Sequence, residues 1–203
     1  MSKVTMTKKE IQALSERLSH STAYNKYEVE VLLKSYFHEK NKYKMDRAVF
    51  REIISNHFGL RDDLLMDRVF RTFDKDNDSF LNMEEFVNGM HILTRASMEQ
   101  KKSYCFKVYD LNGDGIISRE EMFQLLKPTL LKSSGEEDPD EGIKELVEIV
   151  LKKLDMDHDS KVSLEDFVSC LDREPLLLEC LGPILPDHTH ITRFEEKMFG
   201  QSC

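Results

Sequence analysis

The sequence lacks any apolar run long enough to cross a lipid bilayer. Its longest apolar stretch, PLLLECLGPIL from Pro175, is interrupted by Glu179, whereas a membrane-spanning helix needs about 20 apolar residues. The first residues, MSKVTM, contain no apolar signal region, and Ser2 stands where a myristoylated protein has glycine. We therefore expect no membrane association and no lipid anchor.

Cysteine is scarce and follows no recognisable spacing. Only four cysteines are present, at positions 105, 170, 180 and 203, with no CxxC pair and no zinc-binding pattern. Cys203 is the last residue and not fourth from the end, so we expect no prenylation box. These features predict reduced thiols in an intracellular protein.

An overall basic charge is also absent. The formal net charge is −9; residues 1–73 carry 14 Lys and Arg against 10 Asp and Glu, whereas residues 101–203 carry 13 against 22. Proteins that bind nucleic acid usually present a basic surface, so we expect no nucleic acid partner. The acidic second half instead favours cation binding.

The cation-binding signal is clearest in the twelve residues DLNGDGIISREE, which begin at Asp110. Oxygen-bearing side chains stand at positions 1, 3 and 5, glycine at position 6 and glutamate at position 12, as in an EF-hand calcium loop. Calcium takes about 6 to 8 oxygen ligands, so a short loop must turn alternate side chains inward and end on a bidentate carboxylate. The predicted ligands are Asp110, Asn112, Asp114, the Ile116 carbonyl oxygen and Glu121.

The same pattern recurs along the chain. Copies begin at Asp74, Asp155 and, in degraded form, His38, so the four starts are 36, 36 and 45 residues apart. The flanking residues follow helical spacing, and position 8 suits a short strand that joins two loops back to back. Positions 8 and 13 are apolar in every copy: Met45, Leu81, Ile117 and Val162, and Phe50, Phe86, Met122 and Phe167.

This repeat predicts an all-α fold of four EF-hands in two pairs, with a degenerate first hand and extra helices at both termini. The expected N-terminal domain covers 1–95, with a silent hand at 27–57 and an active hand at 61–93. The expected C-terminal domain covers 96–203, with hands at 97–127 and 139–171 followed by the C-terminal helices.

The first copy, HEKNKYKMDRAV, should not bind calcium. Side chains that do not suit the ion replace the oxygen donors at four positions, namely His38, Lys40, Lys42 and Val49. Its apolar positions survive, so we expect it to supply the partner strand for the second loop. The lysines could contact an acidic partner, but we favour an ordinary solvated face.

The second loop, DKDNDSFLNMEE, keeps the ligands but not the glycine. Ser79 stands at position 6, where a left-handed residue other than glycine costs about 1 to 2 kcal/mol. That cost alone would weaken binding about 5- to 30-fold, and an additional carboxylate should offset part of it. The predicted ligands are Asp74, Asp76, Asp78, the Phe80 carbonyl oxygen and Glu85.

The fourth loop, DMDHDSKVSLED, ends on Asp166 instead of glutamate and has Ser160 at position 6. The shorter side chain makes bidentate capture harder, so magnesium should compete with calcium there. We expect the third loop to bind calcium most tightly and the fourth to discriminate least against magnesium. The predicted ligands are Asp155, Asp157, Asp159, the Lys161 carbonyl oxygen and Asp166.

Helical patterns also lie outside the loops. Residues 7–19 predict an amphipathic helix with a capping box between Thr7 and Glu10. Residues 175–181 and 191–199 predict two C-terminal helices that cover a groove left by the paired hands. Pro128 is expected to end a helix before the linker that follows.

No catalytic constellation is evident. A metalloenzyme keeps a coordination position open beside a base or nucleophile, whereas each loop here surrounds its ion with protein oxygens. The seven histidines are scattered, and His188 and His190 are expected in a surface loop. We predict that the protein is not an enzyme. Its ten methionines and its silent hand favour a calcium sensor over a calcium buffer.

Four EF-hands with a silent first copy and a C-terminal extension resemble the neuronal calcium sensor group. Three stretches more closely resemble the calaxin family of ciliary EF-hand proteins: MDRVFRTFDKDND, YDLNGDGIISREEMFQLLK and EEDPDEGIKELVEIVLKKLDMDHDSK.

This resemblance implies a calcium sensor of the cytoplasm and cytoskeleton, located in the axoneme of a cilium or flagellum. It also implies that the protein regulates outer-arm dynein and motility, with the dynein heavy chain and the microtubule-docking apparatus as partners. Three alternatives stay open: a general cytosolic calcium sensor, a regulatory subunit of an enzyme such as a calcineurin-like phosphatase, and a calcium buffer.

Overall fold

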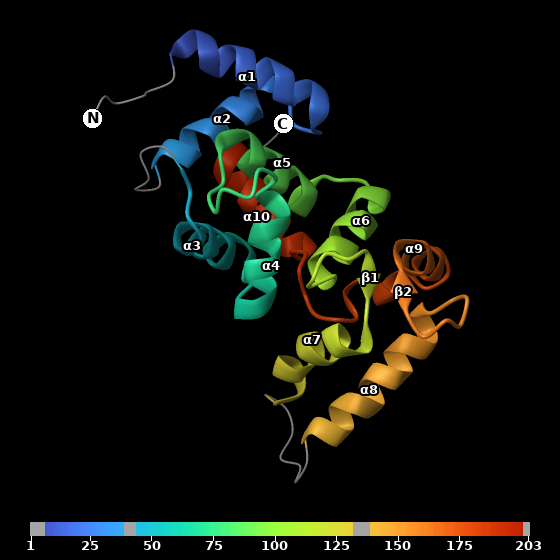
Figure 1. Cartoon of the computed structure of the whole chain (residues 1–203). Coiled ribbons are helices and arrows are strands. Elements are labelled where there is room, and N and C mark those ends of the chain that lie inside the picture. The colour runs from blue at the N-terminus through green and yellow to red at the C-terminus, as the bar shows by residue number, and fades with distance from the viewer. Residues whose placement is uncertain (1–6, 39–43, 132–138, 201–203) are drawn as a thin grey trace. The chain divides into compact units, whose positions relative to one another are not determined.

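The structure is a computed structural model that describes residues 7–38, 44–131 and 139–200. Helices joined by loops make up nearly all of it, with two short strands (Figure 1). The predicted all-α EF-hand fold is confirmed. None of the helices in the described ranges is both long enough and apolar enough to span a membrane.

Contacts between residues divide the chain into two units. The first consists of Met1–Arg61, Phe70–Ser97 and Leu185–Cys203, and the second of Asp62–Val69 and Met98–Ile184. The predicted domains, 1–95 and 96–203, place all the C-terminal helices with the second hand pair. The contacts instead group the residues from Leu185 onward with the first hand pair.

The first unit holds the silent hand and the second hand. Its helices are α1 (Lys8–Ser21), α2 (Lys26–His38), α3 (Arg47–Phe58), the last part of α4 (Asp63–Phe73), α5 (Met83–Thr94) and α10 (His188–Phe199). The predicted capping box at the start of α1 is confirmed, because Thr7 and Glu10 bond each other's backbone amides. Phe50 packs between Phe70 and Phe73, with ring centroids 5.5 Å apart in both pairs.

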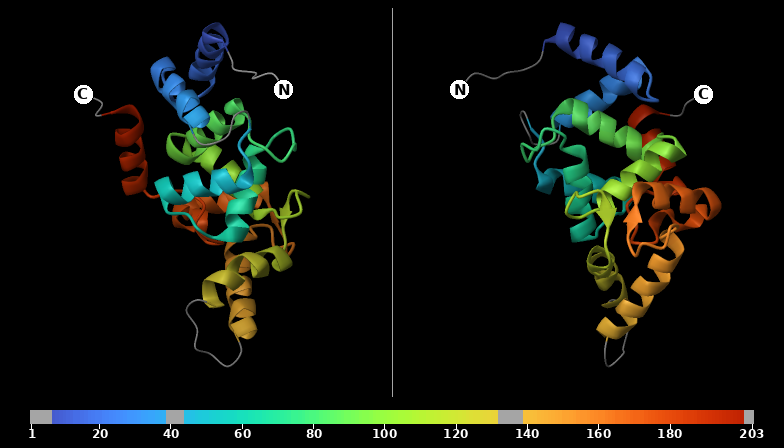
Figure 2. Two further views of the ribbon diagram at one scale, coloured as in Figure 1. Left: turned by 90° about the vertical axis from the view of Figure 1, so that its left-hand side faces the viewer. Right: turned by 45° about the vertical axis from the view of Figure 1, so that its right-hand side comes forward.

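The second unit holds the third and fourth hands. Its elements are the first part of α4, α6 (Met98–Tyr109), β1 (Ile116–Ile117), α7 (Arg119–Leu131), α8 (Pro139–Leu154), β2 (Val162–Ser163), α9 (Leu164–Arg173) and the 3-10 helix η1 (Pro175–Glu179). Helices α7 and α8, yellow and orange in Figure 2, lie side by side in both views. Phe167 packs against Phe106 and Tyr109 at centroid distances of 5.8 and 6.3 Å.

Paired loops hold each unit together at position 8 of the repeat. Strands β1 and β2 are antiparallel, with Ile117 opposite Val162. In the first unit, Met45 and Leu81 form a single antiparallel bridge. The silent loop therefore supplies the partner strand for the second loop, as predicted. The eight residues at positions 8 and 13 are all at most 2% exposed, so the repeat correctly identified core positions.

One predicted helix boundary was wrong. Pro128 does not end α7, because the helix continues to Leu131 with the proline inside it. A proline removes one amide donor, the one that would bond the carbonyl four residues earlier. That carbonyl belongs to Gln124, which is exposed, and water can replace the missing donor.

The C-terminal segment is divided between the two units. In the second unit, Leu181 and Ile184 are fully buried, and the Tyr109 hydroxyl donates to the Gly182 carbonyl oxygen at 2.7 Å. In the first unit, α10 packs against α2 and α3. The prediction that His188 and His190 lie in a loop was wrong, because Asp187 caps α10 and both histidines fall in its first turn.

Candidate metal centre

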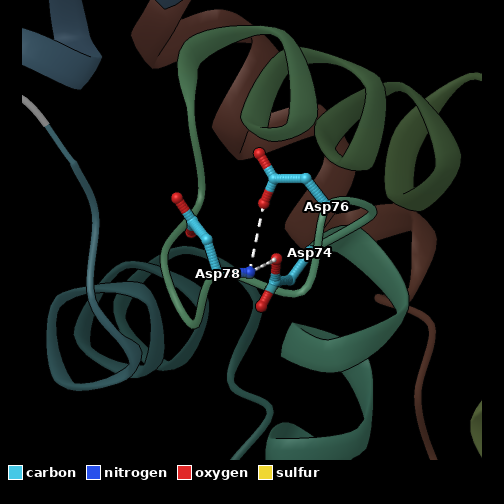
Figure 3. Close-up of side chains that lie close together, drawn as sticks. All are labelled: Asp74, Asp76 and Asp78. Carbon is cyan, nitrogen blue, oxygen red and sulfur yellow. Dashed lines mark hydrogen bonds between the residues drawn. The ribbon is translucent and has the colours of Figure 1, made fainter.

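The second loop gathers its acidic side chains directly after α4. One carboxylate oxygen from each of Asp74, Asp76 and Asp78 lies within 4.8 Å of the others (Figure 3). The Asp78 amide donates to Asp74 Oδ1 at 3.2 Å and to Asp76 Oδ1 at 3.1 Å, and the Ser79 amide donates to Asp74 Oδ2 at 2.9 Å. These backbone bonds hold the Asp74 and Asp76 carboxylates facing the inside of the turn.

Glu85 closes this loop from the first turn of α5. Its Oε1 accepts from the amides of Lys75 at 2.9 Å and Asp76 at 3.3 Å, while Oε2 accepts from the Asn82 amide at 2.9 Å. Asn82 in turn caps α5 by accepting from the Glu85 amide at 3.0 Å. The capping box thus directs the position-12 carboxylate at the start of the loop.

The third loop has the same arrangement. Asp110 Oδ2 accepts from the Gly115 amide at 2.9 Å, and Asp110 Oδ1 accepts from the Asp114 amide at 3.2 Å. The Asp114 amide also donates to Asn112 Oδ1 at 2.8 Å. The Glu121 carboxylate accepts hydrogen bonds from the Asn112 amide at 3.0 Å and from the Ser118 amide at 2.8 Å.

The fourth loop repeats the arrangement with a shorter final side chain. Asp155, Asp157 and Asp159 bring their carboxylate oxygens within 4.8 Å of one another. Asp166 Oδ2 accepts from the Ser163 amide at 3.0 Å and from its hydroxyl. Burial would raise the pKa of Asp166, but the hydrogen bonds from Ser163 and from the amides of Met156 and Asp157 together outweigh it and hold the pKa below its ordinary value.

The three loops share one pattern of burial. The side chains at positions 1 and 12 are at most 7% exposed, whereas those at positions 3 and 5 are exposed. Position 7 is held alike in all three, because its amide donates to the position-5 carboxylate at 2.8 to 2.9 Å. The structure therefore gathers the predicted side-chain ligands of each loop into one turn. Oxygen donors of this kind suit a hard divalent cation.

The backbone at position 6 is left-handed in each loop. Gly115 has φ of +86°, which glycine adopts without steric cost. Ser79 and Ser160 have φ of +67° and +70°, so both serines carry the strain expected from the sequence.

The silent loop contributes one contact that the sequence analysis missed. Lys44, at position 7 of the first copy, forms an ion pair with Asp78 in the second loop. The Lys44 hydrogen bond is the largest influence on Asp78 and holds the pKa of its carboxyl below the ordinary value. Back-to-back loop pairing was the available signal for this contact, because it brings position 7 of one loop near the other.

The structure also places two of the four residues that replace oxygen donors in the silent loop. His38 ends α2 and Val49 lies in α3, whereas Lys40 and Lys42 lie outside the described residues.

Comparison with known proteins agrees with this geometry. Residues 99–170 match the EF-hand domain pair family. Calaxin of Xenopus laevis is 50% identical over 200 residues, which covers 95% of each chain. Calaxin of Homo sapiens is 48% identical over 202 residues, which covers 96% of each chain.

A more distant relative is a calcineurin subunit of Candida glabrata. It is 30% identical over 162 residues, 77% of this chain and 87% of the relative. The calaxins match at higher identity and over almost the whole length, including all four copies of the repeat. The chain therefore belongs to the calaxin family of EF-hand proteins.

Proposed function

We propose that the protein is a calcium sensor whose second, third and fourth loops each bind one calcium ion. Bound calcium supplies two positive charges that offset the repulsion among the carboxylates of a loop. The observation that carries this proposal is the common geometry of the three turns, with buried carboxylates at positions 1 and 12 facing two further oxygen donors. The ligands are the side chains and carbonyl oxygens predicted from the sequence.

Magnesium competes with calcium at the fourth loop in this proposal. Magnesium requires six ligands in near-octahedral geometry, which a monodentate aspartate can satisfy, whereas calcium gains more from a bidentate glutamate. Asp166 provides the shorter side chain and Glu121 the longer one. Calorimetry should therefore find the tighter calcium site lost in Glu121→Gln and the magnesium-sensitive site lost in Asp166→Ala. Equal calcium affinities at the two loops would contradict this order.

A sensor is favoured over a buffer by what covers the two hand pairs. Three side chains of the chain's own C-terminal segment are buried against them: Leu181 and Ile184 in the second unit and Phe194 in the first. Sensor hands expose apolar surface to a target when calcium binds, whereas buffer hands barely move. Segments that cover such surface in the chain itself are suited to exchange with a partner.

The regulated partner is outer-arm dynein in this proposal. The protein would act in the axoneme of a cilium or flagellum, contact the dynein heavy chain and the microtubule-docking apparatus, and adjust beating as calcium changes. Membership of the calaxin family supports this assignment, because the family resemblance is what connects these EF-hands to dynein.

A pull-down from axonemal extract tests the assignment. The full chain is immobilised, extract is applied with calcium or with chelator, and retained dynein heavy chain is measured. We expect retention that changes with calcium, and the same change should be reduced in Glu121→Gln. If no dynein polypeptide is retained under either condition, the ciliary assignment fails.

A phosphatase regulatory subunit is the second candidate. The 30% identity to the Candida glabrata relative supports it, since that relative is named as a subunit of calcineurin. The same pull-down discriminates between the two, because a phosphatase catalytic subunit would be retained in place of dynein.

A further inference from the structure

We propose that Lys44 of the silent hand is a built-in competitor for the second metal loop and lowers its affinity for divalent cations. This inference rests on the proposed function, because it concerns the site formed by Asp74, Asp76, Asp78 and Glu85. By lowering that affinity, Lys44 would set the calcium concentration at which the second loop becomes occupied.

The contact joins the silent hand directly to a predicted ligand. Lys44 Nζ pairs with Asp78 Oδ2, while Asp78 Oδ1 accepts from the Phe80 amide at 2.9 Å. Asp78 also belongs to the group whose carboxylate oxygens lie within 4.8 Å of one another. An ammonium at this carboxylate and a metal ion in the turn would therefore share one ligand, and their like charges repel.

The backbone fixes where Lys44 can reach. Its neighbour Met45 bonds Leu81 in both directions, with N to O distances of 3.1 and 2.8 Å. The Tyr36 hydroxyl also donates to the Leu81 carbonyl oxygen at 2.7 Å. The Lys44 ammonium lies 5.3 Å from the centre of the Phe80 ring, a second contact that keeps it over the loop.

The other hand pair provides an internal comparison. Its loops pair in the same register, so Lys161 occupies position 7 of the fourth copy as Lys44 does in the first. Lys161 is exposed and forms no ion pair with the described residues of the third loop. A lysine at this position is therefore not sufficient, and the pairing with Asp78 distinguishes the first unit.

The size of the effect follows from charge and exposure. Lys44 is half exposed, so water and salt screen its charge. A single charge acting on a divalent ion about 6 to 8 Å away in high dielectric changes the binding constant about 3- to 10-fold. Removing the lysine charge should raise the calcium affinity of the second loop by that factor.

The test uses the full chain with the other two loops silenced by Glu121→Gln and Asp166→Ala. Calcium affinity of the second loop is then measured by calorimetry for the parent, Lys44→Gln, Lys44→Arg and Lys75→Gln. Lys75 is the matched control, because it lies in the same loop, is exposed and has no ion pair among the described residues. We expect Lys44→Gln to gain about 3- to 10-fold, Lys44→Arg to match the parent and Lys75→Gln to gain less.

Salt provides a readout that a merely structural role would not move. The Debye length falls to about 3 Å at 1 M salt, so the gain in Lys44→Gln should shrink there. Equal affinities for the parent and Lys44→Gln, or an equal gain in Lys75→Gln, would overturn the role of Lys44 while leaving calcium binding intact. If the second loop binds no calcium with or without the lysine, both this inference and the proposed site at that loop fail.

Discussion

Position 6 of the loops shows how the choice of one residue sets the free-energy cost of a left-handed backbone. Gly115, Ser79 and Ser160 all have left-handed backbones, with φ between +67° and +86°. Only glycine adopts this conformation without steric conflict between its side chain and backbone. The amides of all three donate to the position-1 aspartate at 2.9 Å, so the turn that orders the site imposes the strain.

Ser79→Gly should therefore stabilise the second loop. We expect the free energy of unfolding of the calcium-loaded protein to rise by about 1 kcal/mol, since relief of the left-handed strain exceeds the entropy that glycine adds to the unfolded chain. Denaturant unfolding in saturating calcium measures the change.

The reverse substitution in the third loop is the control for this prediction. Nothing lies within 4 Å of a Cβ atom added at Gly115, so Gly115→Ser tests backbone conformation with little packing conflict. It should lose about what Ser79→Gly gains. A stabilising or neutral Gly115→Ser would contradict the explanation.

At the scale of elements, α10 is held in the first unit by the aromatic side chains of Phe194 and Phe199 and by Arg95, which lies 5.5 Å from the centre of the Phe199 ring. Phe194 is 3% exposed and lies 5.1 Å from the Phe58 ring and 5.3 Å from the His57 ring. Arg95 bonds Glu195 of α10 at 2.6 Å and Glu28 of α2 at 2.8 Å. Burial would raise the pKa of Glu28, but the hydrogen bonds from Arg95 and Asn25 outweigh it and lower that pKa. The α10 contact thus combines apolar burial with a charged network.

Phe194→Ala should release α10. Truncating a buried phenylalanine to alanine costs about 3 to 5 kcal/mol of stability. We expect this loss to exceed what the other contacts of α10 contribute to its docking. We expect binding of an apolar fluorescent dye to increase in the presence of calcium, because the surface beneath α10 becomes accessible.

Two further variants distinguish release of α10 from general unfolding. Glu196→Ala changes an exposed residue of the same helix and should leave dye binding at the parent level. Deletion of 187–203 removes α10 altogether and should raise dye binding as Phe194→Ala does. Unchanged dye binding in both the deletion and Phe194→Ala would refute a covering role for α10.

At the scale of the whole molecule, charge is the dominant asymmetry. The net charge is −9, and residues 101–203 alone carry 22 Asp and Glu against 13 Lys and Arg. Self-repulsion of this kind destabilises a folded chain, and salt screens it. Three bound divalent ions would reduce the net charge to −3.

The salt dependence of unfolding should therefore depend on calcium. In chelator, the melting temperature should rise as salt increases from low concentration, since screening relieves the repulsion. In saturating calcium the protein should melt at a higher temperature, by mass action, and with a smaller dependence on salt. Scanning calorimetry over a salt series measures both effects.

A variant without the position-12 carboxylates provides the control for the salt series. Glu85→Gln, Glu121→Gln and Asp166→Asn together should remove the response of the melting temperature to calcium. The idea of charge relief by bound ions would be refuted if calcium altered the salt dependence of this variant as it does that of the parent.

Most of the candidate site could be predicted because a calcium loop is local. Its ligands lie within twelve consecutive residues, and spacing alone fixes which side chains turn inward and which residue begins the next helix. The core positions 8 and 13 were predictable for the same reason, since each is tied to the loop by a fixed offset. The family followed from the residues as well.

The sequence by itself determined the loops and the hydrophobic positions, which are set over short stretches of chain, and the repeat predicted which loops pair. Only the tertiary structure decided that α10 packs on the first unit, that the segment through Ile184 packs on the second, and that Lys44 reaches Asp78. An apolar helix face indicates that this face is buried, but it does not indicate which surface it packs against. Its partner depends on which surfaces the rest of the folded chain leaves uncovered.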